Sequence, residues 1–121
     1  MKVRSYQDLE VWQIGMTLAE DSYHLTSMFP KEELYGLTSQ IRRASVSIPA
    51  NIAEGYGREG RQEFIRFLRI AQGSLKELET HLILTTRIGI VTSDRTKPVL
   101  MKCASTSRML RALINSLQKK K

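Results

Sequence analysis

The stretch RQEFIRFLRIAQGSLKELETHLILTTRI, residues 61–88, decides the fold of this chain. Its apolar residues recur at alternating intervals of three and four, the spacing of a helix that buries one side. The buried stripe consists of Phe64, Phe67, Ala71, Leu75, Leu78, Leu82 and Thr85. We therefore predict an amphipathic helix from Arg61 to Ile88, about 40 Å long at about 1.5 Å per residue, which Gly89 ends.

Three further blocks have the same spacing. The first block ends near Met28, before Phe29-Pro30. Its main stripe is Leu9, Trp12, Met16, Ala19 and Tyr23, and a second stripe of Val11, Leu18 and Leu25 widens its apolar face. The next block carries Leu37, Ile41, Ala44, Ile48 and Ile52, and the last carries Leu100, Cys103, Ser107, Leu110, Ile114 and Leu117. Each block predicts one more helix.

The second of the four helices contains Pro49. A proline inside a helix removes one backbone hydrogen bond and presses against the preceding turn, so we predict a kink there. Gly55-Tyr56-Gly57 supplies residues that tolerate a left-handed cap, and we place the end of this helix at 55–58.

Four amphipathic helices with short links, and no segment with the period of a strand, predict an all-α fold. The expected architecture is an up-and-down antiparallel four-helix bundle that forms a single domain over residues 1–121. The first and last helices carry more apolar surface than one such core can use. We therefore expect a homo-oligomer.

The N-terminal region and the hydropathy of the chain favour a soluble protein. Residues 1–8 are polar and lack the apolar segment of a secretory signal, and no apolar run approaches the ~20 residues of a membrane span. We expect a cytoplasmic location and no membrane partner. The lone Cys103 can form neither an internal disulfide nor a multi-cysteine metal site.

Charge is distributed unevenly along the chain. The net charge is −3 over residues 1–36, +1 over 37–59, +2 over 60–91 and +7 over 92–121. The first and last helices of an up-and-down bundle are neighbours, so an acidic first helix can pack against a basic last one. The remaining positive charge, which ends in Lys119-Lys120-Lys121, suits RNA or another polyanion and equally promotes solubility.

The sequence contains no recognisable catalytic arrangement. A di-iron bundle needs Glu-x-x-His on two helices, and His24 and His81 do not provide it. Glu77 and His81 have the spacing of a surface pair on one helix, and Cys103 has no base placed beside it. We expect a non-enzymatic protein without catalytic residues, metal, cofactor or small-molecule substrate, and a nuclease is the least favoured function.

The densest group of polar residues surrounds the junction between the second and third helices. The candidate nucleic-acid-binding residues are Arg42, Arg43, Arg58, Arg61, Arg66, Arg69 and Lys76. On the third helix, Gln62, Arg66, Arg69, Gly73 and Lys76 share one side, which we call the ridge of that helix. Arginine guanidinium groups bind phosphates through several donors, but the same pattern is typical of a solvated helix face. Aromatic residues for base stacking are missing from it.

Asn51 and Glu54 lie close to the apolar stripe of the second helix. A buried polar pair must be hydrogen-bonded, and it often fixes helix register or subunit orientation. We favour this structural role for Asn51 and Glu54 over catalysis.

Several segments resemble one known family. They are YQDLEVWQ (6–13), FPKEE (29–33), LYGLTSQIRRA (34–44), SIPANIAEG (47–55) and EFIRFL (63–68). These segments look like those of the 23S rRNA intervening-sequence proteins, also called the four-helix-bundle protein family. The segment from Ile48 to Gly55 is the most specific of them, and the last thirty residues match by pattern alone.

The resemblance implies a bacterial four-helix bundle, often encoded within insertions in ribosomal RNA genes, that assembles into a ring-like homo-oligomer, expected to be a pentamer. Accessory proteins of diversity-generating retroelements look similar in fold and hold nucleic acid on a basic surface. The expected function is therefore that of a non-enzymatic oligomeric bundle that binds RNA or nucleoprotein. The alternative is an oligomeric scaffold or adaptor with no nucleic-acid contact.

Overall fold

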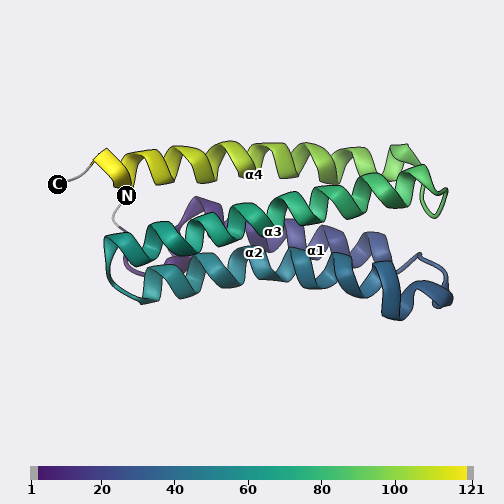
Figure 1. Ribbon diagram of the computed structural model, residues 1–121, viewed down its shortest axis with the longest axis horizontal. Coiled ribbons are helices and arrows are strands. Elements are labelled where there is room, and N and C mark those ends of the chain that lie inside the picture. The colour runs from purple at the N-terminus through teal and green to yellow at the C-terminus, as the bar shows by residue number, and fades with distance from the viewer. Residues whose placement is uncertain (1–2, 120–121) are drawn as a thin grey trace.

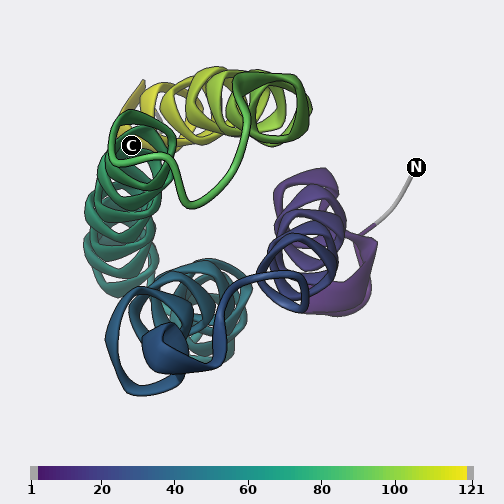
Figure 2. The ribbon, with the colours of Figure 1, turned by 90° about the vertical axis from the view of Figure 1, so that its right-hand side faces the viewer.

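The computed structural model describes residues 3–119. Four long helices, α1 (Glu10–Thr26), α2 (Ser39–Gly57), α3 (Arg61–Arg87) and α4 (Ser93–Lys119), run up and down in turn (Figure 1). Viewed along the bundle, they follow one another around its axis in chain order, and α1 also contacts α4 (Figure 2). The described residues form no strand, and none of their helices is long and apolar enough to cross a membrane. The predicted all-α, up-and-down four-helix bundle is confirmed.

Short helical turns join α1 to α2. A 3₁₀ turn, Lys31–Glu33, leads into a π-helical turn, Leu34–Thr38, and another 3₁₀ turn, Tyr6–Asp8, precedes α1. The chain breaks its helical path at Gly36, where φ is −110° and ψ is −114°. This break separates the connecting turns, residues 31–38, from α2, and it lies next to Leu37, the first apolar residue of the stripe predicted for that helix.

α3 supplies the centre of the core. Its predicted stripe is buried from Phe67 to Thr85, and Phe64 at its start is half-buried. The helix ends at Arg87, one residue earlier than predicted. Gly89 follows with a φ of 81°, a left-handed value that glycine adopts without steric cost, so its role at the end of α3 is confirmed.

α1 buries its second predicted stripe completely and its main stripe only in part, since Ala19 is buried and Leu9 and Trp12 pack against the core. Val11, Leu18 and Leu25 are buried, whereas Met16 and Tyr23 of the predicted main stripe are 38% and 46% exposed. Both stripes have helical spacing, so periodicity alone does not rank them, and the aliphatic stripe is the one that faces the other helices. Met16 and Tyr23 leave apolar surface on the outside of α1.

α2 is continuous from Ser39 to Gly57 although Pro49 lies within it, and the predicted kink at Pro49 is not confirmed. The helix ends within the predicted range. The left-handed residue after it is Glu59, with a φ of 63°, so assigning this role to the Gly55–Gly57 segment was wrong. Both glycines belong to the helix, and Gly55 is buried.

Opposite charges connect the first and last helices. α1 contains three acidic residues and no lysine or arginine, whereas α4 contains six basic residues and only one acidic residue. Lys102 of α4 forms an ion pair with Asp21 of α1. Complementary packing of an acidic first helix against a basic last helix is therefore present within one chain.

Candidate nucleic-acid interface

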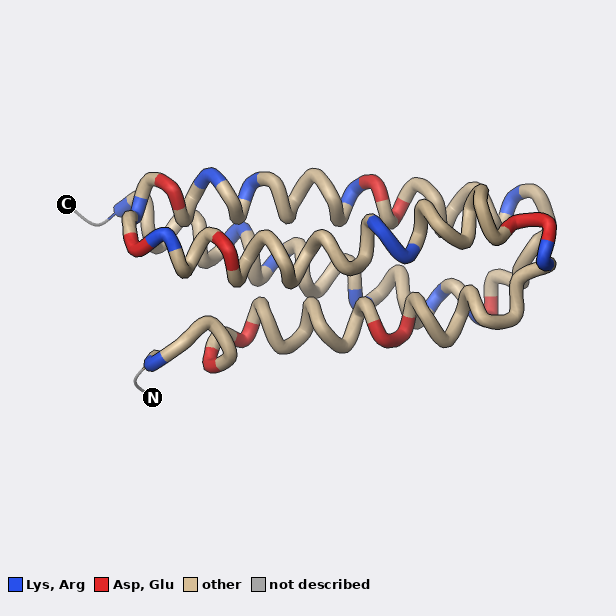
Figure 3. Tube along the Cα trace, turned by 90° about the horizontal axis from the view of Figure 1, so that it is seen from below, with Lys and Arg blue, Asp and Glu red and all other residues tan. Residues whose placement is uncertain are grey.

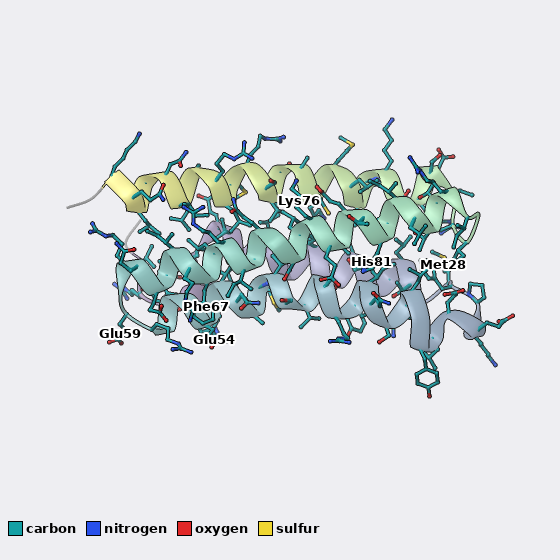
Figure 4. All side chains as sticks on the ribbon, in the orientation of Figure 1. Met28, Glu54, Glu59, Phe67, Lys76 and His81 are labelled. Carbon is teal, nitrogen blue, oxygen red and sulfur yellow. The ribbon has the colours of Figure 1, made fainter. Side chains whose placement is uncertain are left out.

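Two candidate arginines enclose an aromatic ring where α2 meets α3. The guanidinium carbons of Arg58 and Arg66 lie 5.0 and 4.5 Å from the centroid of the Phe67 ring. Arg58 is 3.0 Å from Glu54 and 3.7 Å from Glu63, and Arg66 donates two hydrogen bonds to Glu63 at 2.9 and 3.1 Å. We call these five residues the Phe67 cluster; Figure 4 labels Glu54 and Phe67 within it. The cluster contains as many carboxylates as guanidinium groups.

Hydrogen bonding stabilises the charges of this cluster. The hydrogen bond from Arg66 is the main reason that the pKa of Glu63 lies below its ordinary value, and the same bond raises the pKa of Arg66. Both side chains therefore remain charged throughout the neutral range. A phosphate would have to compete with Glu63 for Arg66, since the carboxylate already accepts hydrogen bonds from Nε and Nη2 of that guanidinium.

Gly55 is what lets α2 approach this cluster. A Cβ atom at position 55 would lie 2.5 Å from the Cβ of Phe67 and 3.3 Å from Cδ1 of Phe64. Carbon atoms in ordinary contact are about 3.5–4.0 Å apart, so only glycine fits between the two helices. We expected Gly55 to end a helix; its role here is to allow close packing.

Arg42 and Arg43 do not join the Phe67 cluster. They precede Arg58, the residue that caps the C-terminal end of α2, by sixteen and fifteen residues, a distance of about 22–24 Å at about 1.5 Å per residue. The single constellation proposed from the sequence is therefore not brought together. Arg42 instead connects α2 to α1: its Nε donates to the hydroxyl of Thr26 at 2.8 Å, and its guanidinium lies 4.6 Å from the ring centroid of Tyr23.

Arg43 is exposed at a polar cleft between α2 and α3. The cleft has a volume of about 200 Å³. Its other lining residues are Gln40, Ala44, Ser47, Ser74 and Glu77. Arg43 thus faces a mixed polar surface that includes a carboxylate of α3.

The α3 ridge is exposed along its whole length, as predicted. Lys76 lies 3.1 Å from Glu79, and Arg66 is held by Glu63. Figure 3 shows acidic residues interspersed with the basic ones along α3. Arg61 is exposed in the first turn of α3 and Arg69 in the third. Much of the positive charge of this ridge is therefore balanced locally.

Asn51 and Glu54 occupy different environments. The half-buried Asn51 donates to the carbonyl and the hydroxyl oxygen of Ser47, both at 2.8 Å, and the Ser47 hydroxyl lies 2.8 Å from that of Ser74 on α3. This chain of hydrogen bonds links α2 to α3. Glu54 is exposed and pairs with Arg58, so the expected buried pair of Asn51 and Glu54 does not form.

The titratable groups outside the ridge form no catalytic arrangement among the described residues. The predicted Glu77–His81 pair is present at 3.3 Å, and Nδ1 of His81 is buried without a hydrogen-bond partner. Cys103 is fully buried, and burial raises its pKa to about 12, so the thiol is protonated at neutral pH. Residues 3–119 bring together no group of three His, Cys, Asp or Glu side chains that could hold a metal.

The candidate list omitted the basic residues of α4. These are Arg95, Lys97, Lys102, Arg108, Arg111 and Lys119; Lys120 and Lys121 lie outside the described residues. The signal was present in the sequence as the net charge of +7 over residues 92–121. What the sequence did not show is how many of the α3 charges have carboxylate partners.

Comparisons with known proteins agree with this architecture. The family model described as 23S rRNA-intervening sequence protein matches residues 7–112. A crystal structure of a protein of unknown function from the S23 ribosomal protein family of Bacteroides thetaiotaomicron superimposes with a TM-score of 0.80 at 25% identity. That alignment covers 86% of this chain and 97% of the other. A search of curated proteins gives no match. Because the family model matches most of this chain, the chain belongs to the 23S rRNA-intervening sequence protein family.

Proposed function

We propose that the protein is a non-enzymatic RNA-binding module that acts as an oligomer of identical chains. One observation carries the proposal: positive charge gathers on one half of the bundle. The neighbouring helices α3 and α4 hold eleven lysine and arginine residues against four acidic ones, whereas α1 and α2 hold two against four. The basic side formed by α3 and α4 attracts a phosphate backbone, and the acidic side formed by α1 and α2 repels it. A nucleic acid therefore approaches the bundle from the basic side.

RNA is the polyanion that the comparisons favour, because the description of the matching family names 23S rRNA. A role without catalysis is supported by the protonated, buried Cys103 and by the pairing of the arginines at the Phe67 cluster with carboxylates. Charge attraction without a catalytic group is typical of proteins that bind or organise a nucleic acid.

The test is binding of a fluorescently labelled structured RNA to the purified protein, followed by anisotropy. We expect measurable affinity at low salt and a steep loss between about 50 and 200 mM salt, because binding releases counterions from the RNA. Absence of affinity at low salt would refute the proposal. Rapid cleavage of the RNA, with or without divalent metal, would refute the non-enzymatic part.

Self-association is proposed from the apolar outside of α1 and α2. A groove of about 600 Å³ is lined by Tyr23, Leu34, Tyr35, Arg42 and Val46, among others. A second hollow of about 360 Å³ shares Tyr23 and Val46 and extends to Met16. Tyr35 is 93% exposed. Apolar surface of this extent is unusual on a chain of 121 residues that works alone.

A second copy of the chain is the proposed occupant, because each chain carries a second apolar surface that could fill the groove. The outer side of α3 exposes Ile70, Leu84 and Ile88, which lie on one side of the helix at about 3.6 residues per turn. A contact between two different surfaces of the same chain is heterologous and closes into a ring when its rotation permits. This geometry agrees with the pentamer that the family resemblance implies.

Analytical sedimentation tests this contact by comparing the oligomer mass of two variants. Val46→Glu changes the groove, and Met101→Glu is its matched control. Both residues are exposed apolar side chains, on α2 and α4 respectively, but only Val46 lines the groove. We expect Val46→Glu to lower the mass of the oligomer and Met101→Glu to leave it unchanged. A monomeric wild-type protein, or equal masses for all three, would refute the assignment.

The second candidate function is an oligomeric scaffold that contacts only protein, and the apolar groove favours it. Under this alternative the protein would have the proposed oligomeric mass but no affinity for RNA. The scaffold hypothesis also gives Asn51 and Glu54 a role in subunit orientation, so Asn51→Ala or Glu54→Ala should change the oligomer mass. An unchanged mass in both variants would count against that role.

A further inference from the structure

The outer side of α4 carries a row of cations with regular spacing. Lys97, Arg108 and Lys119 are exposed and follow one another at intervals of eleven residues, which is close to three helical turns. The three side chains therefore lie on one side of α4, about 16 Å apart and spanning about 33 Å in all. Arg111, also exposed, lies one turn from Arg108. We call Lys97, Arg108 and Lys119 the α4 row.

The α4 row differs from the α3 ridge in having no carboxylate partner among residues 3–119. Arg108 donates a hydrogen bond to the hydroxyl of Ser105 at 3.2 Å, and no ion pair involves a residue of the row. The ridge residues Arg66 and Lys76, by contrast, lie at 2.9 and 3.1 Å from glutamates. No ion pair within the described residues therefore competes with an anion for the three cations of the row.

The position of the row leaves it accessible when the apolar surfaces are covered. Viewed along the bundle, α4 lies across from α2 and beside α3 and α1 (Figure 2). The groove proposed for self-association lies on α1 and α2, and the apolar side that would fill it lies on α3. The side of α4 that points away from the core takes part in neither surface.

The composition of α4 indicates which kind of polyanion fits. The helix contains no Phe, Tyr or Trp, so it lacks the stacking platforms with which proteins hold single strands. Met101 is its only large apolar side chain that is strongly exposed among the described residues, and a protein partner would need more such anchors. A straight row of cations matches a rigid partner whose negative charges continue along its length.

We propose that the α4 row binds the phosphate backbone of double-helical RNA. The proposal rests on the proposed function and names its binding surface and the form of its ligand. Each cation of the row contacts phosphate oxygens and makes no contact with base edges, so binding does not depend on base sequence.

The test compares two triple variants that remove the same charge from different surfaces. The row variant is Lys97→Gln, Arg108→Gln and Lys119→Gln, and the matched ridge variant is Arg66→Gln, Arg69→Gln and Lys76→Gln. Fluorescence anisotropy measures binding to a short RNA duplex, its DNA counterpart and one isolated RNA strand at several salt concentrations. Circular dichroism and sedimentation confirm that each variant keeps its helices and its oligomeric state.

We expect only the row variant to lose affinity for the RNA duplex. Its affinity for the RNA duplex should fall about tenfold or more, and the slope of log K against log salt should decrease by about 2–3, at about 0.9 per phosphate contact. The ridge variant should bind within about threefold of the wild-type protein, since two of its three cations, Arg66 and Lys76, are already paired with glutamates.

Three outcomes would overturn the inference while leaving the proposed function intact. Equal losses in both variants would show that only total charge matters. A row variant that binds as well as the wild-type protein would place the contact elsewhere. Tighter binding of the single strand or the DNA duplex by the wild-type protein would contradict double-helical RNA as the ligand. Failure of the wild-type protein to bind any RNA would refute the proposed function itself.

Discussion

Gly55→Ala tests the claim that a single missing side chain sets the distance between α2 and α3. The added Cβ would lie 2.5 Å from the Cβ of Phe67. Ordinary carbon contacts are about 3.5–4.0 Å, so the two helices would have to separate locally by about 1 Å. Because the atom on the opposite side belongs to the base of the Phe67 side chain, a rotamer change cannot relieve the clash.

The expected cost follows from two opposing contributions. Overpacking a closely packed contact costs about 1–3 kcal/mol. Replacing glycine by alanine in a helix recovers up to about 1 kcal/mol, and less at position 55, which lies in the last turn of α2. We therefore expect Gly55→Ala to lower the free energy of unfolding by about 1–2 kcal/mol and the melting temperature by about 4–8 °C.

Gly57→Ala is the matched control, because it lies in the same helical turn and a Cβ there would have no neighbour within 4 Å. Its stability should equal or slightly exceed that of the wild-type protein. Urea unfolding followed by circular dichroism, at one protein concentration for all variants, measures the difference. If Gly55→Ala proved as stable as Gly57→Ala, the argument for a close approach at Phe67 would be wrong.

Three further predictions follow from individual groups. Asn51→Ala removes the two hydrogen bonds that Asn51 donates to Ser47 and should lower the free energy of unfolding in urea by about 1 kcal/mol, whereas Asn115→Ala, on the exposed side of α4, should lower it hardly at all. The pKa of Cys103 is raised from 9.0 to about 12 in the folded protein. The stabilising contribution of the protonated thiol to the free energy of unfolding should therefore be complete below about pH 9 and be lost toward pH 12. When the free energy of unfolding is measured against pH, Cys103→Ala should show a shallower decline over this range. The pKa of Glu63, measured by NMR titration, should lie below its ordinary value and rise in Arg66→Gln; an unchanged pKa would show that Arg66 does not stabilise the carboxylate.

The candidate site was only partly predictable from the sequence. Helical periodicity correctly placed Gln62, Arg66 and Lys76 on one exposed side of α3, because side-chain direction in a helix depends only on position along the chain. The carboxylate partners of these residues depend on rotamers and on the packing of α2 against α3, which the sequence does not state. The assignment of Arg42 to the same patch failed because the residue turns toward Thr26 and Tyr23 of α1.

The sequence by itself determined the number of helices, the limits of α3 and the bundle architecture. These follow from local physical chemistry: an apolar residue every three or four positions demands one buried helix face, and Gly89 adopts the left-handed conformation that ends a helix. Tertiary structure alone decided how far each of the two apolar stripes of α1 is buried, because burial depends on the surface that faces the helix. Tertiary structure also gave Gly55 its role, since a clash between two helices exists only after they have packed.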